Sequence, residues 1–560
     1  MTTPAIGVAC TPNSTAPSDP PSASPPGPPR TRSGAIAWQR LPAAPGEIEI
    51  SLAGATAVLD ALWDSPELTG HARSAGRRQR LESTYHDMPG GLLKGRMATL
   101  RLRRVGRRCI QTLKSGHPAD PVRRGEWETG VAGFAYELDA FTDPAARDGL
   151  AGVEAAALVP ILTTRVLRRV KVLEIPDNPA TGDGAAVIEA ALDQGTIEAG
   201  GTSQPISEIE LELKRGDPAA LFTIARALVA AAPLRVETLS KAARGWSLAD
   251  DAPPGWSKAE KTAVRAKATV DEAFSVIVVD CVRHWVANQA AAADGRHPEG
   301  VHQMRVALRR LRSAVQVFRD VLAPERYETL AEESKWLADE LGDARDWDVF
   351  DEELLAPVRA GLGDDADLAQ LSGHVDRFRS AGGDRARAAI ASGRAAGLLV
   401  DLWHWIEQKG WRGEADGEQR AVLDGRIVGF ADRLLDAAHR RAMKAGKGFK
   451  KLSPAGRHKV RIRMKRLRYL SEFFAELYPA KRTKGYLKAM EALQSALGHL
   501  NDVAVAQARL AELAAADPAT ARAAGLVLGW HGRGAVDVDS DLVKSWEQFA
   551  ETSPFWHTDR

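Results

Sequence analysis

The stretch that decides the fold lies at residues 207–217 and reads SEIELELKRGD. Glu208, Glu210 and Glu212 alternate in it with large aliphatic residues. A β-strand turns successive side chains to opposite faces, so this stretch would place its carboxylates on one face and its aliphatic side chains on the other. One such strand is also explained by a polar face that is simply wet, so the pattern gains meaning only if other strands repeat it.

Four further stretches in the first half of the chain repeat the alternation. The residues that fall on the charged faces are Glu47, Glu49 and Ser51 in EIEIS, Arg101 and Arg103 in TLRLRR, Thr112 and Lys114 in QTLK, and Glu126 and Glu128 in EWE. Acids gather on some strands and bases on others, which favours strands curled round a shared polar cavity over an open sheet. A closed barrel also leaves no exposed sheet edge.

A cavity that is lined by both acids and bases fits a metal-bound polyanion. Grouped carboxylates bind hard cations such as Mg²⁺ or Mn²⁺ through oxygen, while Arg and Lys bind phosphate oxygens. The sequence contains no P-loop and no convincing Ser-His-Asp arrangement, so we expect no covalent nucleophile.

Composition limits the class of protein. The 560 residues include 75 Lys and Arg against 73 Asp and Glu, so any electrostatic function must come from local segregation of charge. Cys10, Cys109 and Cys281 are far apart and odd in number, which indicates a reducing cytoplasm. No apolar run approaches the roughly 20 residues of a membrane span. We therefore expect a soluble cytoplasmic protein without a membrane partner.

The periodicity changes from strand-like to helical after the turn Pro-Pro-Gly at 253–255. We expect four segments: a disordered Pro/Ser-rich tail at 1–35, a strand-rich domain at 36–251, a linker at 252–265 and a helical domain at 266–555.

The helical half contains a duplication. HQMRVALRRLR at 302–312 and HKVRIRMKRLR at 458–468 are separated by 156 residues, and the same offset places LG at 341–342 onto LG at 497–498 and Asp346 onto Asp502. The equivalent polar residues are His302 and His458, Arg305 and Arg461, Arg309 and Lys465, and Arg312 and Arg468. Register kept over almost 40 residues indicates a duplicated helical unit.

Each copy forms a basic stripe, because positions i, i+3, i+7 and i+10 lie within about 80° on a helix. A basic face on one helix is usually just solvated, but its repetition favours a function. Pairing the copies about a pseudo-twofold axis would bring both stripes to one groove, which would fit a linear polyanion. The two stretches contain no aromatic residue to stack on bases, which argues against nucleic acid.

The first half resembles the CYTH or triphosphate tunnel metalloenzyme family, and more narrowly its bacterial inorganic triphosphatases. The matching stretches are EIEIS, TYHD at 84–87, TLRLRR, QTLK, EWE, ALDQGTIEAG at 191–200, SEIELELKRGD and LSKAARG at 239–245. The resemblance implies an α+β fold in which an antiparallel eight-stranded β tunnel precedes the helical domain.

The resemblance also implies residue roles. The metal ligands for Mg²⁺ or Mn²⁺ would be Glu47, Glu49, Asp193, Glu208, Glu210 and Glu212. The substrate-binding bases would be Arg101, Arg103, Lys114, Arg165 and Lys241, with Lys114 and Lys241 also catalytic, and with Arg124, Arg168 and Lys214 as further candidates. Glu126 and Glu128 would position bases or support a second metal.

Ser51 departs from the family pattern, which is Glu-x-Glu-x-Lys near the amino terminus. At an effective dielectric near 20, one lost cation about 4 Å from a phosphate removes on the order of 4 kcal/mol of gross attraction. Slower turnover and loss of catalysis are both compatible with this change.

The helical half resembles the CHAD domain, an all-α domain that is often fused behind CYTH and is associated with inorganic polyphosphate. Its further match is LGDARDWDVF at 341–350, which is echoed by LGHLNDVAVA at 497–506. The resemblance implies polyphosphate binding by the eight stripe residues His302, Arg305, Arg309, Arg312, His458, Arg461, Lys465 and Arg468.

Together the resemblances imply a cytoplasmic inorganic triphosphatase that cleaves tripolyphosphate to diphosphate and phosphate and associates with polyphosphate. Two alternatives stay open. One is a non-catalytic polyphosphate-binding adaptor with a degenerate tunnel. The other is a hydrolase or cyclase that acts on thiamine triphosphate or a nucleoside triphosphate.

Overall fold

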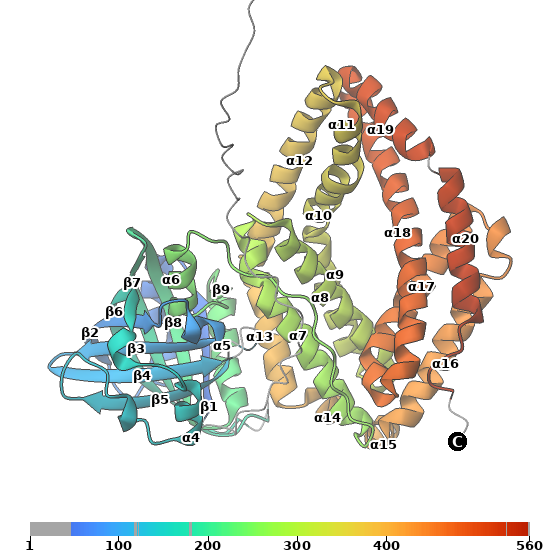
Figure 1. Ribbon diagram of the computed structural model, residues 1–560. Helices are drawn as coiled ribbons and strands as arrows, with labels where there is room; N and C mark the ends of the chain where they lie inside the picture. Colours follow the sequence, from blue (N-terminus) through green and yellow to red (C-terminus); the bar gives the residue numbers. More distant parts are fainter. Residues whose placement is uncertain (1–45, 117–119, 121, 179–181, 534, 558–560) are drawn as a thin grey trace, which may run out of the picture. The chain divides into compact units, whose positions relative to one another are not determined.

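The computed structural model describes residues 46–116, 120, 122–178, 182–533 and 535–557. The tail expected at 1–35 lies outside the described residues. Strands come first in the chain and helices follow, as Figure 1 shows by the change from blue strands to green, yellow and red helices. None of the described helices combines the length and the apolar character that crossing a bilayer requires.

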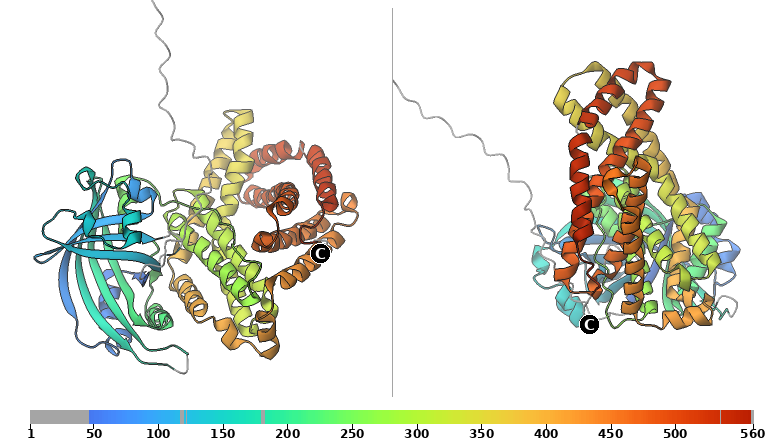
Figure 2. Two further views of the ribbon diagram at one scale, coloured as in Figure 1. Left: turned by 60° about the horizontal axis from the view of Figure 1, so that its bottom comes forward. Right: turned by 90° about the vertical axis from the view of Figure 1, so that its right-hand side faces the viewer.

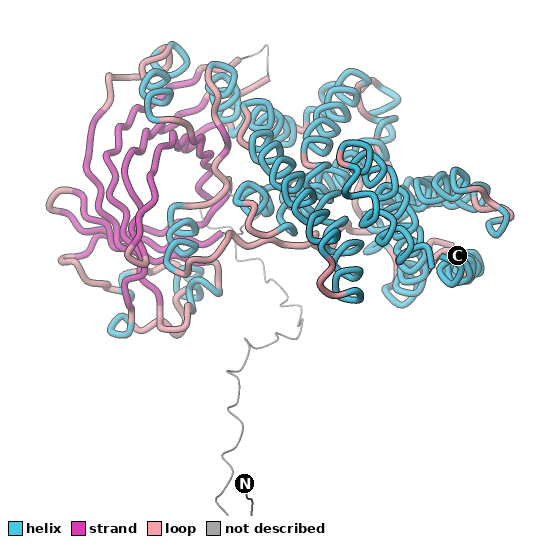
Figure 3. The backbone as a smooth tube through the Cα atoms, turned by 90° about the horizontal axis from the view of Figure 1, so that it is seen from above, coloured by secondary structure: helices cyan, strands magenta, loops and turns pink. Residues whose placement is uncertain are grey.

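Eight strands form a closed antiparallel barrel. They are β1 Gly46–Ala53, β2 Arg77–Asp87, β3 Ala98–Val105, β4 Arg108–Gly116, β5 Arg123–Val131, β6 Val159–Ile175, β7 Ala186–Ala199 and β8 Thr202–Gly216. Their order is β5-β4-β3-β2-β6-β7-β8-β1, and pairing of β5 with β1 closes the ring, while the short β9 Arg235–Val236 adds to β1. Figure 3 shows the strands of this tunnel curving round, and the predicted eight-stranded tunnel is confirmed.

The strand register places the charged residues of the predicted stretches on one face, the inner wall of the tunnel. Glu208 lies opposite Asp193 on the neighbouring strand, and Asp193 lies opposite Arg168 on the next. The alternate residues of β1, β7 and β8, such as Ile209, belong to a buried core with α1 Thr56–Trp63 and α5 Pro218–Ala231. The alternation in the sequence therefore separates the charged wall from the core.

Helix α6, Lys241–Ala249, contacts β6, β7 and β8. Its Ala242 shares a buried cluster with Leu81, Tyr85 and Val166, which stand on the same strand faces as the tunnel charges. The Ser240 hydroxyl caps the helix by accepting a hydrogen bond from the backbone N–H of Ala243. This packing brings the first residue of α6 to the charged inner wall. The other helices of this part are α2 Pro66–Thr69, α3 Leu92–Gly95 and α4 Pro144–Gly149.

The rest of the chain is helical. The helices are α7 Val270–Asp294, α8 Pro298–Val317, α9 Pro324–Glu340, α10 Gly342–Val349, α11 Ala356–Leu362, α12 Ala366–Ile390, α13 Gly393–Glu407, α14 Gly410–Glu414, α15 Gly417–Leu423, α16 Ile427–Ala445, α17 Pro454–Phe474, α18 Ala480–Ala516, α19 Ala521–Arg533 and α20 Ala535–Glu551. Helices α8 and α17 both begin at a proline, Pro298 and Pro454, with the offset of 156 residues that the sequence shows.

The two copies of the helical unit differ after this first helix. The first copy is broken into α9, α10, a π-helical turn at Phe350–Leu355 and α11, whereas the second runs as the single 37-residue helix α18. Helices α11 and α12 meet α19 at their far ends, where they share a core of their own that includes Leu371 and Val527 (Figures 1 and 2).

Candidate functional site

Three carboxylates gather on the inner wall of the tunnel. Asp193, Glu208 and Glu210 each offer an oxygen atom, and these atoms all lie within 4.8 Å of one another. Asp193 and Glu208 are only 1% and 2% exposed. Buried carboxylates at such distances require cations to offset their mutual repulsion.

Three basic side chains supply that positive charge. The Lys241 Nζ atom lies 2.9 Å from Asp193, 2.5 Å from Glu208 and 2.6 Å from Glu210. Arg168 donates two hydrogen bonds of 2.7 Å to Asp193 and contacts Glu210 at 2.5 Å. Arg244 donates to Glu208 at 2.7 Å. We call Asp193, Glu208 and Glu210 the acidic cluster. Lys241, Arg168 and Arg244 are its cations.

The ion pairs shift the pKa values of Glu210 and Lys241 in the direction that keeps both side chains charged. Burial alone would raise the pKa of Glu210, but Lys241 and Arg168 hold this pKa well below its usual value. Burial likewise acts to lower the pKa of Lys241, and the carboxylates of Asp193, Glu208 and Glu210 more than offset it, so the pKa is raised. Glu210 and Lys241 are therefore charged together over the physiological pH range.

A second group of charges lies on β3, β4 and β5. Arg101 lies 3.3 Å from both Glu126 and Glu128, and Lys114 lies 3.1 Å from Glu126. The Thr112 hydroxyl donates to Glu128 at 3.0 Å. Glu126 and Glu128 thus form ion pairs with two of the predicted bases.

Arg103 has a different environment from its neighbour Arg101. Its Nε donates to the Ser83 hydroxyl at 3.2 Å. Burial, together with the charges of Arg101 and Arg168, lowers the pKa of Arg103 to about 10. The interaction with Arg168 shows that the second group of charges lies near the acidic cluster inside the tunnel.

The remaining predicted acids lie on β1 and β8. Glu49 is buried and contacts Arg124 at 3.2 Å, so the structure joins these two candidates in an ion pair. Glu212 contacts Lys214 at 2.5 Å, and burial raises the pKa of Glu212. The backbone of Glu47 pairs with β5, but its side chain lies outside the described residues.

Arg165 is not brought to the tunnel charges. Its side chain is 53% exposed and forms ion pairs with Glu82 and Glu198. Arg168 stands on the opposite face of the same strand, because the two positions are three apart and side chains alternate along a strand, and it is Arg168 that reaches the acidic cluster. This placement corrects the expectation that Arg165 is a phosphate-binding base of the tunnel.

Ser51 lies opposite Glu210 on the neighbouring strand β8. Cross-strand partners share a face, so Ser51 belongs to the inner wall next to the acidic cluster. A lysine at this position would add a cation beside Glu210.

The acidic cluster fits a metal ion by the chemistry of its donors. It supplies three carboxylates and no soft sulfur or imidazole ligand. Oxygen-only sets of this kind suit Mg²⁺, Mn²⁺ or Ca²⁺ rather than zinc or copper. Asp193, Glu208 and Glu210 are therefore the described residues that would hold such an ion.

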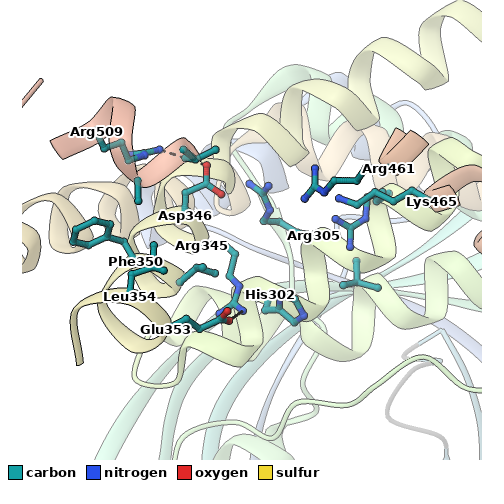
Figure 4. A pocket seen from close by; sticks show the side chains of 15 residues that line it. His302, Arg305, Arg345, Asp346, Phe350, Glu353, Leu354, Arg461, Lys465 and Arg509 are labelled. Atoms are coloured by element: carbon teal, nitrogen blue, oxygen red, sulfur yellow. Dashed lines mark hydrogen bonds and ion pairs between the residues drawn. The ribbon is translucent and has the colours of Figure 1, made fainter. Parts of the chain in front are cut away.

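The helical part contains a basic pocket with a cavity volume of about 380 Å³ (Figure 4). Both copies of the repeat contribute equivalent positions to its lining. The pairs are Arg305 and Arg461, Arg309 and Lys465, Val349 and Val505, Phe350 and Ala506, and Glu353 and Arg509. Residues 156 positions apart thus face one cavity, as expected for two copies related by a pseudo-twofold axis.

The pocket is not symmetric in detail. His302 lines it, whereas the equivalent His458 is exposed and is not among the lining residues. Arg345 lies 3.7 Å from Glu353, and Arg509 lies 3.4 Å from Asp346. Burial and the positive charge of Arg345 lower the pKa of His302 to about 4, so this imidazole is neutral at pH 7.

The structure brings five of the eight predicted stripe residues into the pocket: His302, Arg305, Arg309, Arg461 and Lys465. Arg312 and Arg468 do not line it, and Arg468 pairs with Glu472 at 2.6 Å. Sequence reasoning did not single out Arg345 and Arg509 as basic residues of this site.

The sequence analysis also did not single out Arg244 as a basic residue of the tunnel. Its position three residues after Lys241 on α6 is the signal that would have found it, because residues three apart share a helix face.

The fold and its sites define a β tunnel lined with paired acids and bases, followed by a duplicated helical domain with a basic pocket. Comparison with protein families agrees with both parts. The CYTH domain model matches residues 62–246, and the CHAD domain model matches residues 277–511. The chain therefore combines a CYTH domain with a CHAD domain.

Individual relatives match one part each. The chain is 29% identical over 168 residues to an inorganic triphosphatase of Haemophilus influenzae, which covers 30% of this chain and 46% of that protein. The chain thus spans less than half the length of this curated relative.

Two solved structures also match one part of the chain each. The CHAD domain from the plant Ricinus communis is 32% identical and covers 53% of this chain and 98% of its own, with a TM-score of 0.47. A putative adenylyl cyclase from Hippeastrum, described as having a dominant triphosphatase activity, is 19% identical and covers 36% of this chain and 95% of its own, with a TM-score of 0.27.

Proposed function

We propose that the protein is a metal-dependent inorganic triphosphatase that hydrolyses tripolyphosphate to diphosphate and phosphate in its tunnel. The observation that carries this proposal is the acidic cluster, in which three buried carboxylates within 4.8 Å of one another share the inner wall with several bases. The named activity of the Haemophilus influenzae relative supports the same assignment.

The residues of the tunnel divide into two roles in this proposal. Asp193, Glu208 and Glu210 would hold Mg²⁺ or Mn²⁺, Glu49 and Glu212 are further acids of the same wall, and Glu47 stays a predicted ligand. The bound ion would screen the phosphate charges and lower the pKa of a water molecule. Arg101, Arg103, Lys114, Arg168 and Lys241 would bind the phosphate oxygens and stabilise the charge that develops on the leaving diphosphate.

The CHAD domain would bind inorganic polyphosphate in the basic pocket. Its lining contains the basic residues Arg305, Arg309, Arg345, Arg461, Lys465 and Arg509, and the acidic residues Asp346 and Glu353. This excess of positive charge fits a chain of phosphates, each of which carries negative charge and hydrogen-bond acceptors. Unpaired thiols at Cys109 and Cys281 support a cytoplasmic location.

Ser51 favours a second candidate, a polyphosphate-binding adaptor whose tunnel no longer catalyses. The inner wall lacks one cation of the family pattern at the position opposite Glu210. Thiamine triphosphate and nucleoside triphosphates are further substrates to be compared with tripolyphosphate in the same assay.

The deciding experiment measures phosphate release from tripolyphosphate with Mg²⁺ and with Mn²⁺. The native chain should release phosphate only with metal, and the double variant Glu208→Gln/Glu210→Gln should lose at least 100-fold in rate. The variant Glu325→Gln/Glu328→Gln removes two exposed carboxylates of α9 instead and is the matched control for the loss of charge. Metal-independent release would contradict the metal dependence of the proposed reaction, and absence of release with polyphosphate binding retained would favour the adaptor.

A further inference from the structure

The Lys241 ammonium occupies the centre of the acidic cluster. It lies within 2.9 Å of all three carboxylates that could hold a metal ion, and its side chain is 12% exposed. An ammonium group and a divalent cation use the same carboxylate oxygens. Both cannot be held at once without a strong repulsion between like charges in a buried site.

The charges of the cluster are already balanced. Asp193, Glu208 and Glu210 bring three negative charges, and Lys241, Arg168 and Arg244 bring three positive charges. A divalent cation added to this balanced group would leave a buried excess of positive charge. A polyanion that binds at the same time would remove that excess.

Lys241 is the cation best able to leave the carboxylates. Arg168 is held by two parallel hydrogen bonds to Asp193, and Arg244 is shared between Glu208 and Glu237. Lys241 instead ends in a compact ammonium on a flexible four-carbon stem, which can turn to a new partner without moving the helix. Lys114 is close enough to help lower the pKa of Glu210, so a phosphate bound by Lys114 would lie near the Lys241 ammonium.

We propose that Lys241 competes with the divalent cation for the acidic cluster, and that metal binds tightly only when a triphosphate draws the ammonium away from the carboxylates. This inference rests on the proposed function for the identity of the anion. It makes Lys241 a residue that couples the two ligands. The coupling is reciprocal, because whatever factor the triphosphate adds to metal affinity, the metal must add to triphosphate affinity.

The test is a titration of the full chain with Mn²⁺, in which free Mn²⁺ is measured by its electron paramagnetic resonance signal. Lys241→Gln should bind Mn²⁺ at least tenfold more tightly than the native chain in the absence of phosphate compounds. Lys241→Arg keeps the competing charge and should stay within about twofold of the native chain. Lys94→Gln removes one charge from a lysine that pairs with Asp250 and should also leave the affinity unchanged.

Two results would overturn the proposal. One is a Lys241→Gln protein that binds Mn²⁺ no more tightly than the native chain. The other is an equal gain in Lys94→Gln, which would assign the effect to net charge alone. Adding Glu208→Gln and Glu210→Gln to Lys241→Gln should abolish the gain, which locates it in the acidic cluster.

A second measurement needs only the native chain and covers the case in which Lys241→Gln fails to fold. Imidotriphosphate, a hydrolysis-resistant analogue of tripolyphosphate, is titrated calorimetrically with and without Mn²⁺, after correction for the Mn²⁺ complex formed in solution. At least tenfold tighter binding with Mn²⁺ is expected, and equal affinities would contradict the coupling. Neither readout requires turnover, so absence of hydrolysis with a gain in Lys241→Gln would remove the proposed function and leave the competition standing.

Discussion

The tunnel and the helical pocket both gather arginine and lysine, but they balance these charges differently. In the tunnel, three carboxylates meet three cations at distances of 2.5 to 2.9 Å. The pocket lining instead contains six basic residues, Arg305, Arg309, Arg345, Arg461, Lys465 and Arg509, and two acidic residues, Asp346 and Glu353. A balanced site must exchange partners when a ligand enters, whereas a site with excess positive charge attracts an anion directly. The first arrangement suits catalysis, and the second suits binding.

The largest effect is expected from Arg168, which tests the assignment of the tunnel wall. Arg168→Gln should lower kcat/KM for tripolyphosphate at least 100-fold, because Arg168 contacts two carboxylates of the acidic cluster and faces the proposed substrate. Arg165→Gln, three residues away on the exposed face, should change it by less than twofold. Steady-state phosphate release measures both variants. Equal losses would show that the outer face of β6 takes part in the reaction.

The next effect separates the pocket from the tunnel. Arg305→Gln/Arg461→Gln removes one equivalent cation from each copy of the repeat and should weaken polyphosphate binding at least tenfold, with tripolyphosphate hydrolysis unchanged. Arg385→Gln/Arg394→Gln removes two arginines that are 56% and 50% exposed, and it is the matched control. Fluorescence anisotropy of labelled polyphosphate reports the affinity. A parallel loss of hydrolysis would show that the two sites act together.

Ser51→Lys should change the charge balance of the tunnel and leave the pocket unaltered. A lysine opposite Glu210 would add one cation beside the acidic cluster. We expect a severalfold lower KM for tripolyphosphate, because an added positive charge attracts the substrate in a partly desolvated site. Polyphosphate affinity of the pocket serves as the internal control. A rise in KM would indicate that the added ammonium competes with the metal more than it assists the substrate.

Much of the tunnel could be predicted because its strands alternate strictly. In SEIELELKRGD the acids can occupy only one face, and the structure confirms the closed tunnel that this pattern predicts. Strand β6 is different, because its TTRVLRRVK stretch places arginines on both faces, at Arg165 and Arg168. Periodicity alone does not say which face lies inside. That choice depends on pairing with β7, where Arg168 meets Asp193.

The duplication likewise predicted part of the pocket and left part of it open. A constant offset predicted that both basic stripes meet, and Arg305 and Arg461 do line one cavity. The contribution of Arg345 and Arg509 depends on where α10 and α18 cross the pocket, which no local pattern encodes. His302 and His458 occupy equivalent positions of the repeat, but the helices around them differ between the two copies. His302 therefore lines the pocket, whereas His458 is exposed.

The smallest effect concerns this difference between the two histidines. Burial and the nearby cations Arg345, Arg309 and Arg305 lower the pKa of His302 to about 4, while the carboxylate of Glu299 acts to raise it. A bound phosphate chain adds negative charge beside the imidazole and should raise this pKa. The complex would then bind more protons than the free protein, so polyphosphate affinity should rise as the pH falls from about 7 towards 5, into the range just above the pKa of the free protein.

The measurement is polyphosphate affinity as a function of pH for the native chain and two variants. The native chain should gain a few-fold in affinity over this range, and His302→Gln should lose most of that gain because it cannot take up the proton. His458→Gln changes the equivalent but exposed histidine, and it should keep the native pH profile. A flat profile in the native chain, or the same loss in both variants, would show that the pocket does not couple its anion to a proton on His302.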